Sequence, residues 1–450
     1  MPSVTISYSP QKKAIEQTTL RMTVPPDKSI LHRALIISAL SESTITFPLI
    51  DRVGEDIVTT INALRQLGVR IEHSDFGITV IGVGKRGLQA SANPIDCRNS
   101  GTTARLLMGV LSAQNFSSTL IGDESLSRRP MGRLAELLNT ELGADISTTE
   151  GLLPVKINGR ELHSANVMLP VASAQIKSSL LLAVFCSGVF LTLTEPYQSR
   201  DHTEIMLRAC GVDIQSNNTT VFLPAGRELQ LPKQFQWEIP GDISSASFLM
   251  VAGAISNTDL IIENVGINPS RTAAIETLSD SGVPIFINEA RQHFGENIGN
   301  VQVSASNSQA YKSFFFSHSA IPNIQDEIPA LSVFAAFAKG TSSFAGATEL
   351  RVKESDRLKA LYNNLSVSGV QVTESPDGLQ ITGSEKNLAG DITVNNFNDH
   401  RIAMAMSVAA LRSEGRVIIP DSDVVSVSYP SFFDRLRQIA DVSGHDISIA

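Results

Sequence analysis

A two-part pattern occurs six times along this chain, at intervals of about 70 to 85 residues. Each copy begins with a polar cluster that runs directly into an apolar stretch; the six clusters begin at Pro26, Arg98, Ala172, Gly241, Asn323 and Asn398. Each copy continues with an amphipathic stretch that stops at a glycine and precedes a short alternating run; the glycines are Gly68, Gly143, Gly211, Gly282, Gly369 and Gly444. A repeat of this length indicates one supersecondary unit present in six copies.

Each unit predicts two helices with short strands around them. In the first unit we expect an apolar helix over residues 29–40, an amphipathic helix over 55–67, and strands over 44–47, 69–72 and 78–81. The other expected helices span residues 106–111, 133–142, 176–185, 203–209, 245–254, 272–279, 328–338, 356–365, 402–411 and 432–440. Because a helix that is apolar on all sides belongs at the centre of a domain, we expect three units around each of two cores.

The length of 450 residues also favours two domains, since it exceeds what one hydrophobic core usually serves. Residues 236–241 separate the third unit from the fourth and are the natural crossover. A strand expected over residues 4–8 precedes the first unit and can pair with the distant half. The expected domains are therefore residues 1–24 plus 240–450, and residues 25–239, with a hinge where the chain crosses twice.

Composition narrows the classes of protein to consider. The net charge of −9 argues against non-specific nucleic-acid binding, which needs a basic surface. Cys97, Cys186 and Cys210 are far apart, and their spacing fits neither a disulfide framework nor a zinc site. We therefore expect a cytoplasmic protein without a bound metal. The uncharged stretch 178–194 is short for a membrane span, so we expect a buried helix followed by a strand.

Basic residues recur where the helices of the repeat begin. They are Lys28, Arg33, Arg105, Lys177 and Arg401 at the apolar helices, and Arg129, Arg200, Lys353 and Arg357 at the amphipathic ones. Taken singly, each is best explained as a solvated charge or a helix-end ion pair. A cation that loses its water beside the positive end of a helix is unfavourable unless an anion lies there too. Their recurrence predicts a shared polyanionic ligand, which arginine binds well through paired hydrogen bonds.

Acidic residues stand among these cations. Asp326, Glu327, Glu354 and Asp356 precede expected helices, where each can be a cap, a general acid or base, or both. Residues 101–103, Gly-Thr-Thr, can allow a ligand to approach the backbone closely, or can simply form a turn.

Eight short motifs in order along the chain resemble the 5-enolpyruvylshikimate-3-phosphate synthase family. They span residues 26–33, 99–105, 129–133, 172–178, 200–204, 326–329, 351–357 and 399–404. The sequences of residues 129–132 and 200–203 resemble those of the bacterial class II branch of the family. The resemblance implies an α/β (α+β) fold of two domains, each with three βαβαββ units around buried parallel helices.

The resemblance also implies the reaction and its residues. The family transfers the enolpyruvyl group of phosphoenolpyruvate to the 5-hydroxyl of shikimate 3-phosphate and releases phosphate, without a cofactor or a metal. By match to the motifs, shikimate 3-phosphate would be held by Ser29, Arg33, Ser173, Gln175 and Arg200, with Lys353 nearby. Phosphoenolpyruvate would be held by Lys28, Gly101, Arg129, Arg357 and Arg401. Asn99, Thr102, Arg105 and Ala174 complete the expected substrate site.

Proton transfer is expected from Asp326, Glu354 and Lys28, with Asp326 as the base for the 5-hydroxyl. The expected partners are the two small substrates and the inhibitor glyphosate, with no nucleic acid and no membrane, and the expected state is a monomer. Many class I members carry a lysine where this chain has Val427. Some glyphosate-tolerant class II members carry alanine where this chain has Gly101, so we expect sensitivity to glyphosate.

Two other functions fit the repeat. The sister enolpyruvyl transferase that acts on UDP-N-acetylglucosamine shares the architecture, but it normally carries a reactive cysteine in the loop that here spans residues 125–129. A non-catalytic scaffold built from repeats is the third candidate. It would have no need of Lys28, Arg129, Asp326, Glu354 and Arg401 at the starts of its units.

Overall fold

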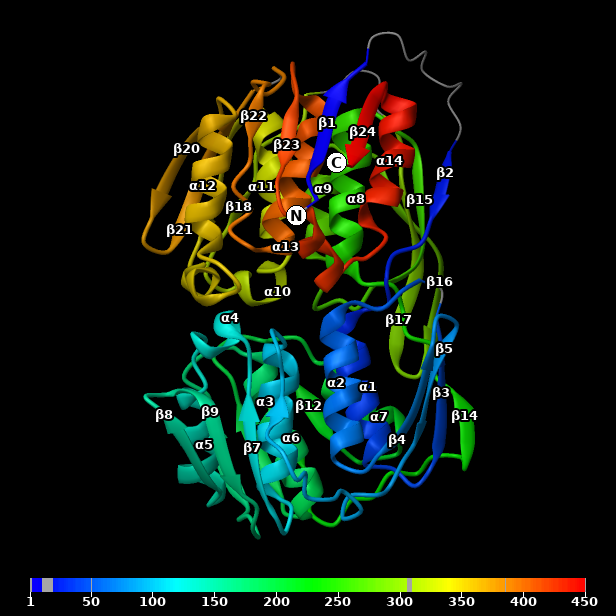
Figure 1. The fold of residues 1–450 in the computed structure, drawn as a ribbon, viewed down its shortest axis with the longest axis vertical. Coiled ribbons are helices and arrows are strands. Elements are labelled where there is room, and N and C mark those ends of the chain that lie inside the picture. Colours follow the sequence, from blue (N-terminus) through cyan, green and yellow to red (C-terminus); the bar gives the residue numbers. More distant parts are fainter. Residues whose placement is uncertain (1, 10–18, 50, 306–309, 385, 450) are drawn as a thin grey trace.

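The computed structural model describes residues 2–9, 19–49, 51–305, 310–384 and 386–449. Within these residues the chain forms six four-stranded sheets and two bodies stacked one above the other, as Figure 1 shows. The stretch 178–194 contains a helix and a strand, as expected. Among the described residues no helix is both long enough and apolar enough to cross a membrane.

The lower body of Figure 1 contains the first three units, in the sheets β14–β3–β5–β4, β6–β7–β9–β8 and β10–β11–β13–β12. Its strands are β3 (Thr44–Pro48), β4 (Arg70–Ser74), β5 (Gly77–Ile81), β6 (Ile95–Asp96), β7 (Ser117–Ile121), β8 (Asp145–Thr149), β9 (Leu152–Asn158), β10 (Ala165–Met168), β11 (Leu191–Thr194), β12 (Gln215–Asn217), β13 (Thr220–Leu223) and β14 (Gln234–Gln236). Its helices are α1 (Lys28–Ala39), α2 (Glu55–Gln66), α3 (Gly101–Ser112), α4 (Glu124–Ser127), α5 (Gly132–Leu142), α6 (Ala174–Ser187) and α7 (His202–Ala209).

The upper body contains the last three units, in the sheets β16–β17–β15–β2, β18–β19–β21–β20 and β22–β23–β1–β24. Its strands are β1 (Val4–Tyr8), β2 (Leu20–Met22), β15 (Leu260–Gly266), β16 (Ile285–His293), β17 (Glu296–Val303), β18 (Phe315–Phe316), β19 (Gly340–Ala345), β20 (Gln371–Ser375), β21 (Gly378–Gly383), β22 (Ile392–Thr393), β23 (Val417–Ile419) and β24 (His445–Ile449). Its helices are α8 (Ile243–Ser256), α9 (Ala273–Asp280), α10 (Ile321–Ile324), α11 (Ile328–Phe337), α12 (Arg357–Val367), α13 (His400–Ala409) and α14 (Phe432–Ser443), with short 3₁₀ turns at Thr348–Val352, Ala410–Arg412 and Ser422–Val427.

The pairing of strands repeats with the sequence. Each sheet of the lower body has one parallel pair of strands at one edge and two antiparallel pairs next to it. Each sheet of the upper body has the same arrangement, and in one of them β1 lies antiparallel between β23 and β24. The N-terminal strand thus completes the sixth unit, which confirms that it pairs with the distant half. The six glycines that end the amphipathic stretches all have φ between 73° and 98°, a left-handed conformation that glycine adopts without strain.

The apolar helices form the centres of two cores. Helices α1, α3 and α6 are buried along most of their length in the lower body, and α8, α11 and α13 in the upper body. One core consists of residues between Ile30 and Ile239; the other joins four residues from Val4 to Val24 with residues between Ile243 and Ala440. Helix α3 begins five residues earlier than expected because Ser100 caps it through the Thr103 amide.

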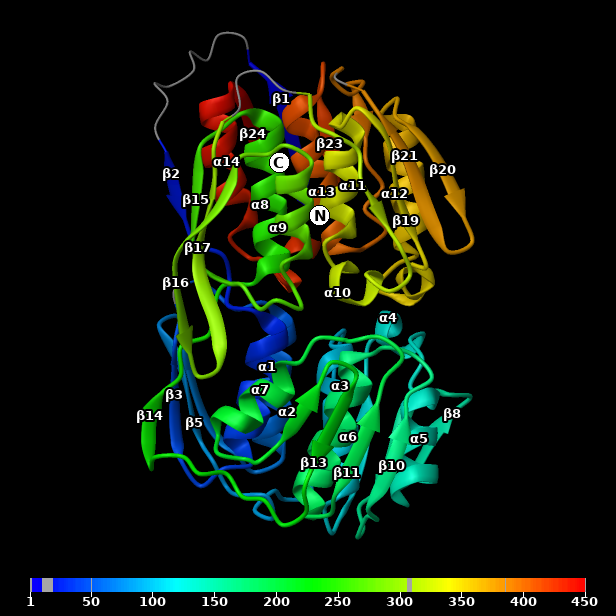
Figure 2. The ribbon, with the colours of Figure 1, turned by 180° about the vertical axis from the view of Figure 1, so that it is seen from behind.

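Three of the segments that join the two bodies are the two crossings of the chain and the β16–β17 hairpin. At the two crossings, the Asp27 amide donates to the Pro240 carbonyl at 2.7 Å, and the Asp242 amide donates to the Pro25 carbonyl at 2.9 Å. The third is the β16–β17 hairpin, which reaches down to the lower body in Figure 2. The centroid of its Phe294 ring lies 4.3 Å from the centroid of the Trp237 ring. Sequence reasoning foresaw the crossings but not this hairpin.

Candidate active site

The starts of the buried helices are capped by side chains of the polar clusters. Asp27, Ser100 and Ser173 accept backbone hydrogen bonds at the starts of α1, α3 and α6 in the lower body. Asp242 and Asp399 do the same for α8 and α13 in the upper body. In α11 no side-chain cap bond forms, and a proline occupies the first turn. The caps satisfy only part of the free N–H groups at each start, so the helix ends retain anion-binding capacity.

A polar cavity lies where the two bodies meet. Eleven of the predicted site residues line it: Ser29, Arg33, Thr102, Arg105, Arg129, Ser173, Ala174, Gln175 and Arg200 from the lower body, with Asp326 and Lys353 from the upper body. Five others adjoin the lining by contact. The Arg129 guanidinium donates to the Asn99 carbonyl, a Cβ on Gly101 would lie 2.7 Å from Arg105 Nη1, and Glu354, Arg357 and Arg401 pair with lining residues.

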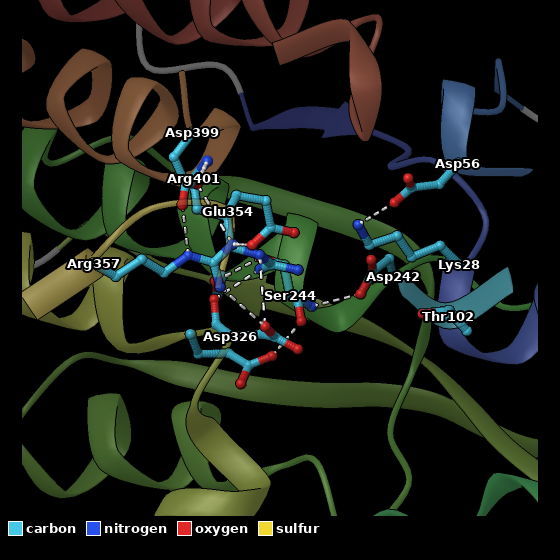
Figure 3. A network of polar contacts seen from close by, with 12 residues as sticks. Lys28, Asp56, Thr102, Asp242, Ser244, Asp326, Glu354, Arg357, Asp399 and Arg401 are labelled. Atoms are coloured by element: carbon cyan, nitrogen blue, oxygen red, sulfur yellow. Dashed lines mark hydrogen bonds and ion pairs between the residues drawn. The ribbon is translucent and has the colours of Figure 1, made fainter. Parts of the chain in front are cut away.

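Asp326 stands at the centre of the arginines. Its Oδ2 lies 2.8 Å from Arg200 Nη2, and its Oδ1 lies 3.4 Å from Arg357 Nη1 and 3.7 Å from Arg401 Nε. Figure 3 shows Arg357 and Arg401 turned toward this carboxylate. Burial acts to raise the pKa of Asp326, but Arg401, Arg200, Lys353 and Arg357 outweigh it and hold that pKa well below its usual range.

Glu354 is also paired with arginines, and it shares Arg357 with Asp326. Its carboxylate lies 2.5 Å from Arg357 Nη2 and 3.8 Å from Arg129 Nη1, which comes from the opposite body. Arg357 is further fixed by Asp399, which accepts from its Nε at 2.9 Å. Burial opposes ionisation of Glu354, yet the neighbouring arginines hold its pKa well below its usual range. Both candidate carboxylates are therefore charged near neutral pH.

Lys28 points toward α2 instead of toward Asp326. Its Nζ lies 2.8 Å from Asp56 Oδ2 in the first turn of α2, as Figure 3 shows. Lys28 nevertheless acts electrostatically on Glu354 and on His400, whose pKa burial and this cation hold well below its usual range. Sequence reasoning did not single out Asp56, because an acidic residue in the first turn of a helix is an ordinary feature.

The lower wall of the cavity is pre-arranged by hydrogen bonds. Gln175 Oε1 accepts from Arg105 Nη1 at 2.8 Å, and Gln175 Nε2 donates to Thr102 Oγ1 at 2.9 Å. Arg33 donates to Ser178 and to the Ser29 carbonyl. These contacts fix the side chains from α1, α3 and α6 in place before any ligand binds.

Positive charge in the cavity is incompletely neutralised. Burial, together with the nearby Arg129, lowers the pKa of Arg105 to about 9. Burial also lowers the pKa of Lys353 to about 8, against the attraction of Asp326. Within the described part of the chain, the Nε atoms of Arg129 and Arg200 are buried and make no hydrogen bond. Unpaired buried donors of this kind are costly, and an anion that accepts from them would remove the cost.

One expectation is wrong. Lys177 does not belong to the cavity, because its Nζ lies 2.9 Å from Glu195 and 2.8 Å from Glu204, and all three side chains are at most 1% exposed. Its position in the first turn of α6 resembles that of the other cations. However, it faces α7, and the sequence alone does not reveal which side of a fully buried helix faces the cavity.

A second residue that the sequence analysis missed is Arg271. Arg271 lies just before α9, 2% exposed, with three carboxylates around it. Arg200 likewise stands two residues before α7 and Arg129 three residues before α5, so the repeat already indicated a basic residue at this place. Among the described residues no group of three His, Cys, Asp or Glu side chains is arranged to hold a metal ion.

Comparisons with known proteins agree on one family. The model of the EPSP synthase (3-phosphoshikimate 1-carboxyvinyltransferase) family matches residues 12–436. The 3-phosphoshikimate 1-carboxyvinyltransferase of Syntrophomonas wolfei is 42% identical over 421 residues, which cover 93% of this chain and 96% of that protein. The enzyme of the same name from Limosilactobacillus fermentum is 43% identical over 429 residues, with coverage of 93% and 96%.

Solved structures give the same result. EPSP synthase from Acinetobacter baumannii superposes with a TM-score of 0.83 at 38% identity, covering 99% of this chain and all of that one. The enolpyruvyl transferase NikO from Streptomyces tendae shares the fold alone, with a TM-score of 0.74 at 16% identity over 100% and 99% of the chains. The repeat, the motifs and these likenesses together place the chain in the EPSP synthase family.

Proposed function

We propose that this chain transfers the enolpyruvyl group of phosphoenolpyruvate to the 5-hydroxyl of shikimate 3-phosphate and releases phosphate. The observation that carries the proposal is the cavity itself, where arginines and a lysine from both bodies surround Asp326 and Glu354. The family and the names of the relatives supply the identity of the substrates.

The charges of the substrates explain why so many cations are needed. Each phosphate carries roughly −1.5 to −2 at neutral pH, and each substrate adds a carboxylate. Two such anions placed side by side repel by several kcal/mol even at an effective dielectric constant of about 20. Cations drawn from both bodies offset this repulsion, and exclusion of water strengthens each contact.

The substrates divide between two groups of residues. Shikimate 3-phosphate is held by Ser29, Arg33, Ser173, Gln175 and Arg200, with Lys353 close by. Phosphoenolpyruvate is held by Lys28, Gly101, Arg129, Arg357 and Arg401. The substrate anions take the place of protein carboxylates on these cations, so that pairs such as Arg200–Asp326 and Arg129–Glu354 open when substrate binds.

This exchange prepares Asp326 for its role as a base. While Asp326 is paired with arginines its pKa is low, and a carboxylate with a low pKa accepts a proton poorly. When phosphate and carboxylate groups of the substrates neutralise those arginines, the pKa of Asp326 rises. As the 5-hydroxyl oxygen bonds to C2 of phosphoenolpyruvate, Asp326 takes the hydroxyl proton, while Lys28 and Glu354 share the protonation of the methylene carbon to a methyl group. Glu354, like Asp326, binds a proton more readily once its arginines pair with the substrates. The C–O bond to phosphate then breaks as a methyl proton returns to Lys28 and Glu354, which restores the methylene carbon and completes the transfer.

Domain movement belongs to the same proposal. We infer that residues 1–24 plus 240–450 and residues 25–239 are the two domains, which open and close about the paired crossings at Pro25 and Pro240. Each domain has its own buried core, which supports rigid movement of one against the other. The chain acts in the cytoplasm as a monomer.

The first prediction tests the reaction and its base. Mixing the protein with shikimate 3-phosphate and phosphoenolpyruvate should release phosphate. Asp326→Asn should lower turnover about 10²- to 10⁴-fold, because the acceptor for the hydroxyl proton is lost, while shikimate 3-phosphate still binds. The exposed Asp280→Asn, at the end of α9, is the matched control and should retain full activity.

Phosphate release with UDP-N-acetylglucosamine instead of shikimate 3-phosphate would identify the sister enzyme. Release with neither acceptor would favour the scaffold. A near-normal rate for Asp326→Asn would remove Asp326 from the role of base.

The second prediction concerns alkaline pH. The pKa of Lys353 is about 8 in the free protein, so its charge is present below that pH and is lost as the pH rises through it. If Lys353 holds a substrate anion, kcat/KM should fall on the alkaline side with an apparent pKa near 8. Lys353→Arg should move this limb to higher pH, because arginine stays protonated. An alkaline limb unchanged in Lys353→Arg would show that another group titrates there.

The third prediction concerns glyphosate. We propose that glyphosate binds in the place of phosphoenolpyruvate, beside Gly101. A methyl group on Gly101 would lie 2.7 Å from Arg105 Nη1 and 3.2 Å from Arg129 Cζ, so Gly101→Ala should push these side chains into the space of the longer inhibitor. The inhibition constant should rise about tenfold or more, and KM for phosphoenolpyruvate should rise less. Equal increases in both constants would argue against this account.

A further inference from the structure

Arg271 is buried between the two bodies and does not line the substrate cavity. Its side chain is 2% exposed. Nη1 lies 3.4 Å from Asp27 Oδ2, and Nη2 lies 3.1 Å from Glu327 Oε1 and 3.8 Å from Asp242 Oδ1. The guanidinium therefore has three carboxylate neighbours at once, each at most 6% exposed.

The three carboxylates come from the starts of three buried helices in different bodies. Asp27 caps α1 of the lower body, Asp242 caps α8 of the upper body, and Glu327 directly precedes α11. Asp27 is followed by Lys28 in the chain, and Glu327 follows Asp326. Arg271 thus touches the residues next to two members of the proposed catalytic group, one on each side of the junction.

Charge-assisted hydrogen bonds through Ser244 complete the attachment on the upper side. Arg271 Nη2 donates to Ser244 Oγ at 2.7 Å, and the Ser244 hydroxyl in turn donates to Glu327. In the view of Figure 3, Ser244 lies between Asp242 and Asp326. Two donors, Ser244 and Arg271, therefore hold the Glu327 carboxylate in place. Because Asp326 precedes Glu327 in the chain, the position of its backbone is restricted as well.

The other titratable and charged groups around Arg271 also come from both bodies. His202 Nε2, at the start of α7, lies 3.5 Å from Arg271 Nη1, and its Nδ1 lies 2.8 Å from Glu296 on the β17 strand. Arg200 approaches Glu327 at 4.0 Å, and Arg401 acts electrostatically on Asp242. Burial and the proximity of Asp27 raise the pKa of Asp242 to about 6, despite Arg271 and Arg401. Any cation at this position has to bind carboxylates in two directions. The planar guanidinium of arginine does this well, whereas the ammonium of lysine does it poorly.

We propose that Arg271 is a positioning residue for the transfer reaction: by binding Asp27 and Glu327 together, it fixes Lys28 and Asp326 relative to each other across the junction. The proposal rests on the function proposed above. It assigns Arg271 no contact with substrate. Its effect reaches the reacting groups through the chain, from Asp27 to Lys28 and from Glu327 to Asp326.

A positioning role predicts different effects on two quantities, the affinity for shikimate 3-phosphate and kcat. Binding of shikimate 3-phosphate alone depends mainly on residues of the lower body, namely Ser29, Arg33, Ser173, Gln175 and Arg200. Hydrogen bonds within that body hold Arg33 and Gln175. Turnover depends in addition on the alignment of the two bodies. Loss of Arg271 should therefore lower kcat strongly while it leaves the affinity for shikimate 3-phosphate nearly unchanged.

The matched control is Lys177→Met. Lys177 is another buried cation that pairs with two carboxylates, Glu195 and Glu204, but all three belong to the lower body and none adjoins a proposed catalytic residue. Substitution of either cation by methionine leaves buried carboxylates unpaired and lowers the melting temperature. Only the Arg271 variant should also change the alignment across the junction.

The test compares wild type, Arg271→Met, Arg271→Lys and Lys177→Met by melting temperature, binding of shikimate 3-phosphate, and phosphate release per folded molecule. We expect kcat to fall about 100-fold in Arg271→Met, since a small misplacement of reacting groups has that effect. Arg271→Lys should recover part of the loss, and Lys177→Met should keep the wild-type kcat. The dissociation constant of shikimate 3-phosphate should change by less than about threefold, which is less than 1 kcal/mol.

Three results would overturn the proposal. One is a kcat per folded molecule in Arg271→Met equal to that of Lys177→Met. Another is a parallel loss of shikimate 3-phosphate binding and turnover. If Arg271→Met does not fold, Arg271→Lys decides, and an unchanged kcat in that variant would overturn the proposal. An inactive wild type would instead refute the proposed function, before any variant is compared.

Discussion

The structure depends on the pairing of buried cations with carboxylates where helices from two bodies meet. An unpaired charge in such a place costs several kcal/mol, and the positive end of a helix adds to the cost for a cation. Asp326 and Glu354 reduce this cost at Arg200, Arg357 and Arg129, and Asp399 reduces it further at Arg357. The ion pairs Arg200–Asp326 and Arg129–Glu354 join one body to the other, so the same contacts hold the two bodies together.

Exchange of partners links this arrangement to function. In the proposed function, anionic substrates compete with Asp326 and Glu354 for the same guanidinium groups, so that substrate binding releases the carboxylates proposed for proton transfer. The sixfold repeat explains how so many charged residues meet at one place. Each unit brings the start of a helix to the same junction, and the units differ there in only a few polar residues. Arg271 in the fourth unit departs from that pattern: its cation binds three carboxylates and stays out of the cavity.

Features that depend on neighbouring residues in the chain could be predicted from the sequence, and features that depend on packing could not. Helix starts and glycine stops are set by nearby residues, and so the expected helices and the left-handed glycines were found within a few positions. Which side of a buried helix faces the cavity is set by packing, so Lys177 was assigned to the wrong environment. The contact of Phe294 with Trp237 arises only when a hairpin of one body meets the other, and no local pattern reports it. The motifs indicated candidate site residues, but the pairing of Lys28 with Asp56 became visible only in the fold.

The most direct test of the central claim is a crystal structure of the Asp326→Asn variant with both shikimate 3-phosphate and phosphoenolpyruvate bound. The account predicts that each phosphate lies within salt-bridge distance of cations, that cations of both bodies contact the pair of substrates, and that Arg129 has left Glu354 for an anion of the ligand. Phosphates bound by one body alone, or outside the junction, with the pair Arg129–Glu354 still intact, would contradict it.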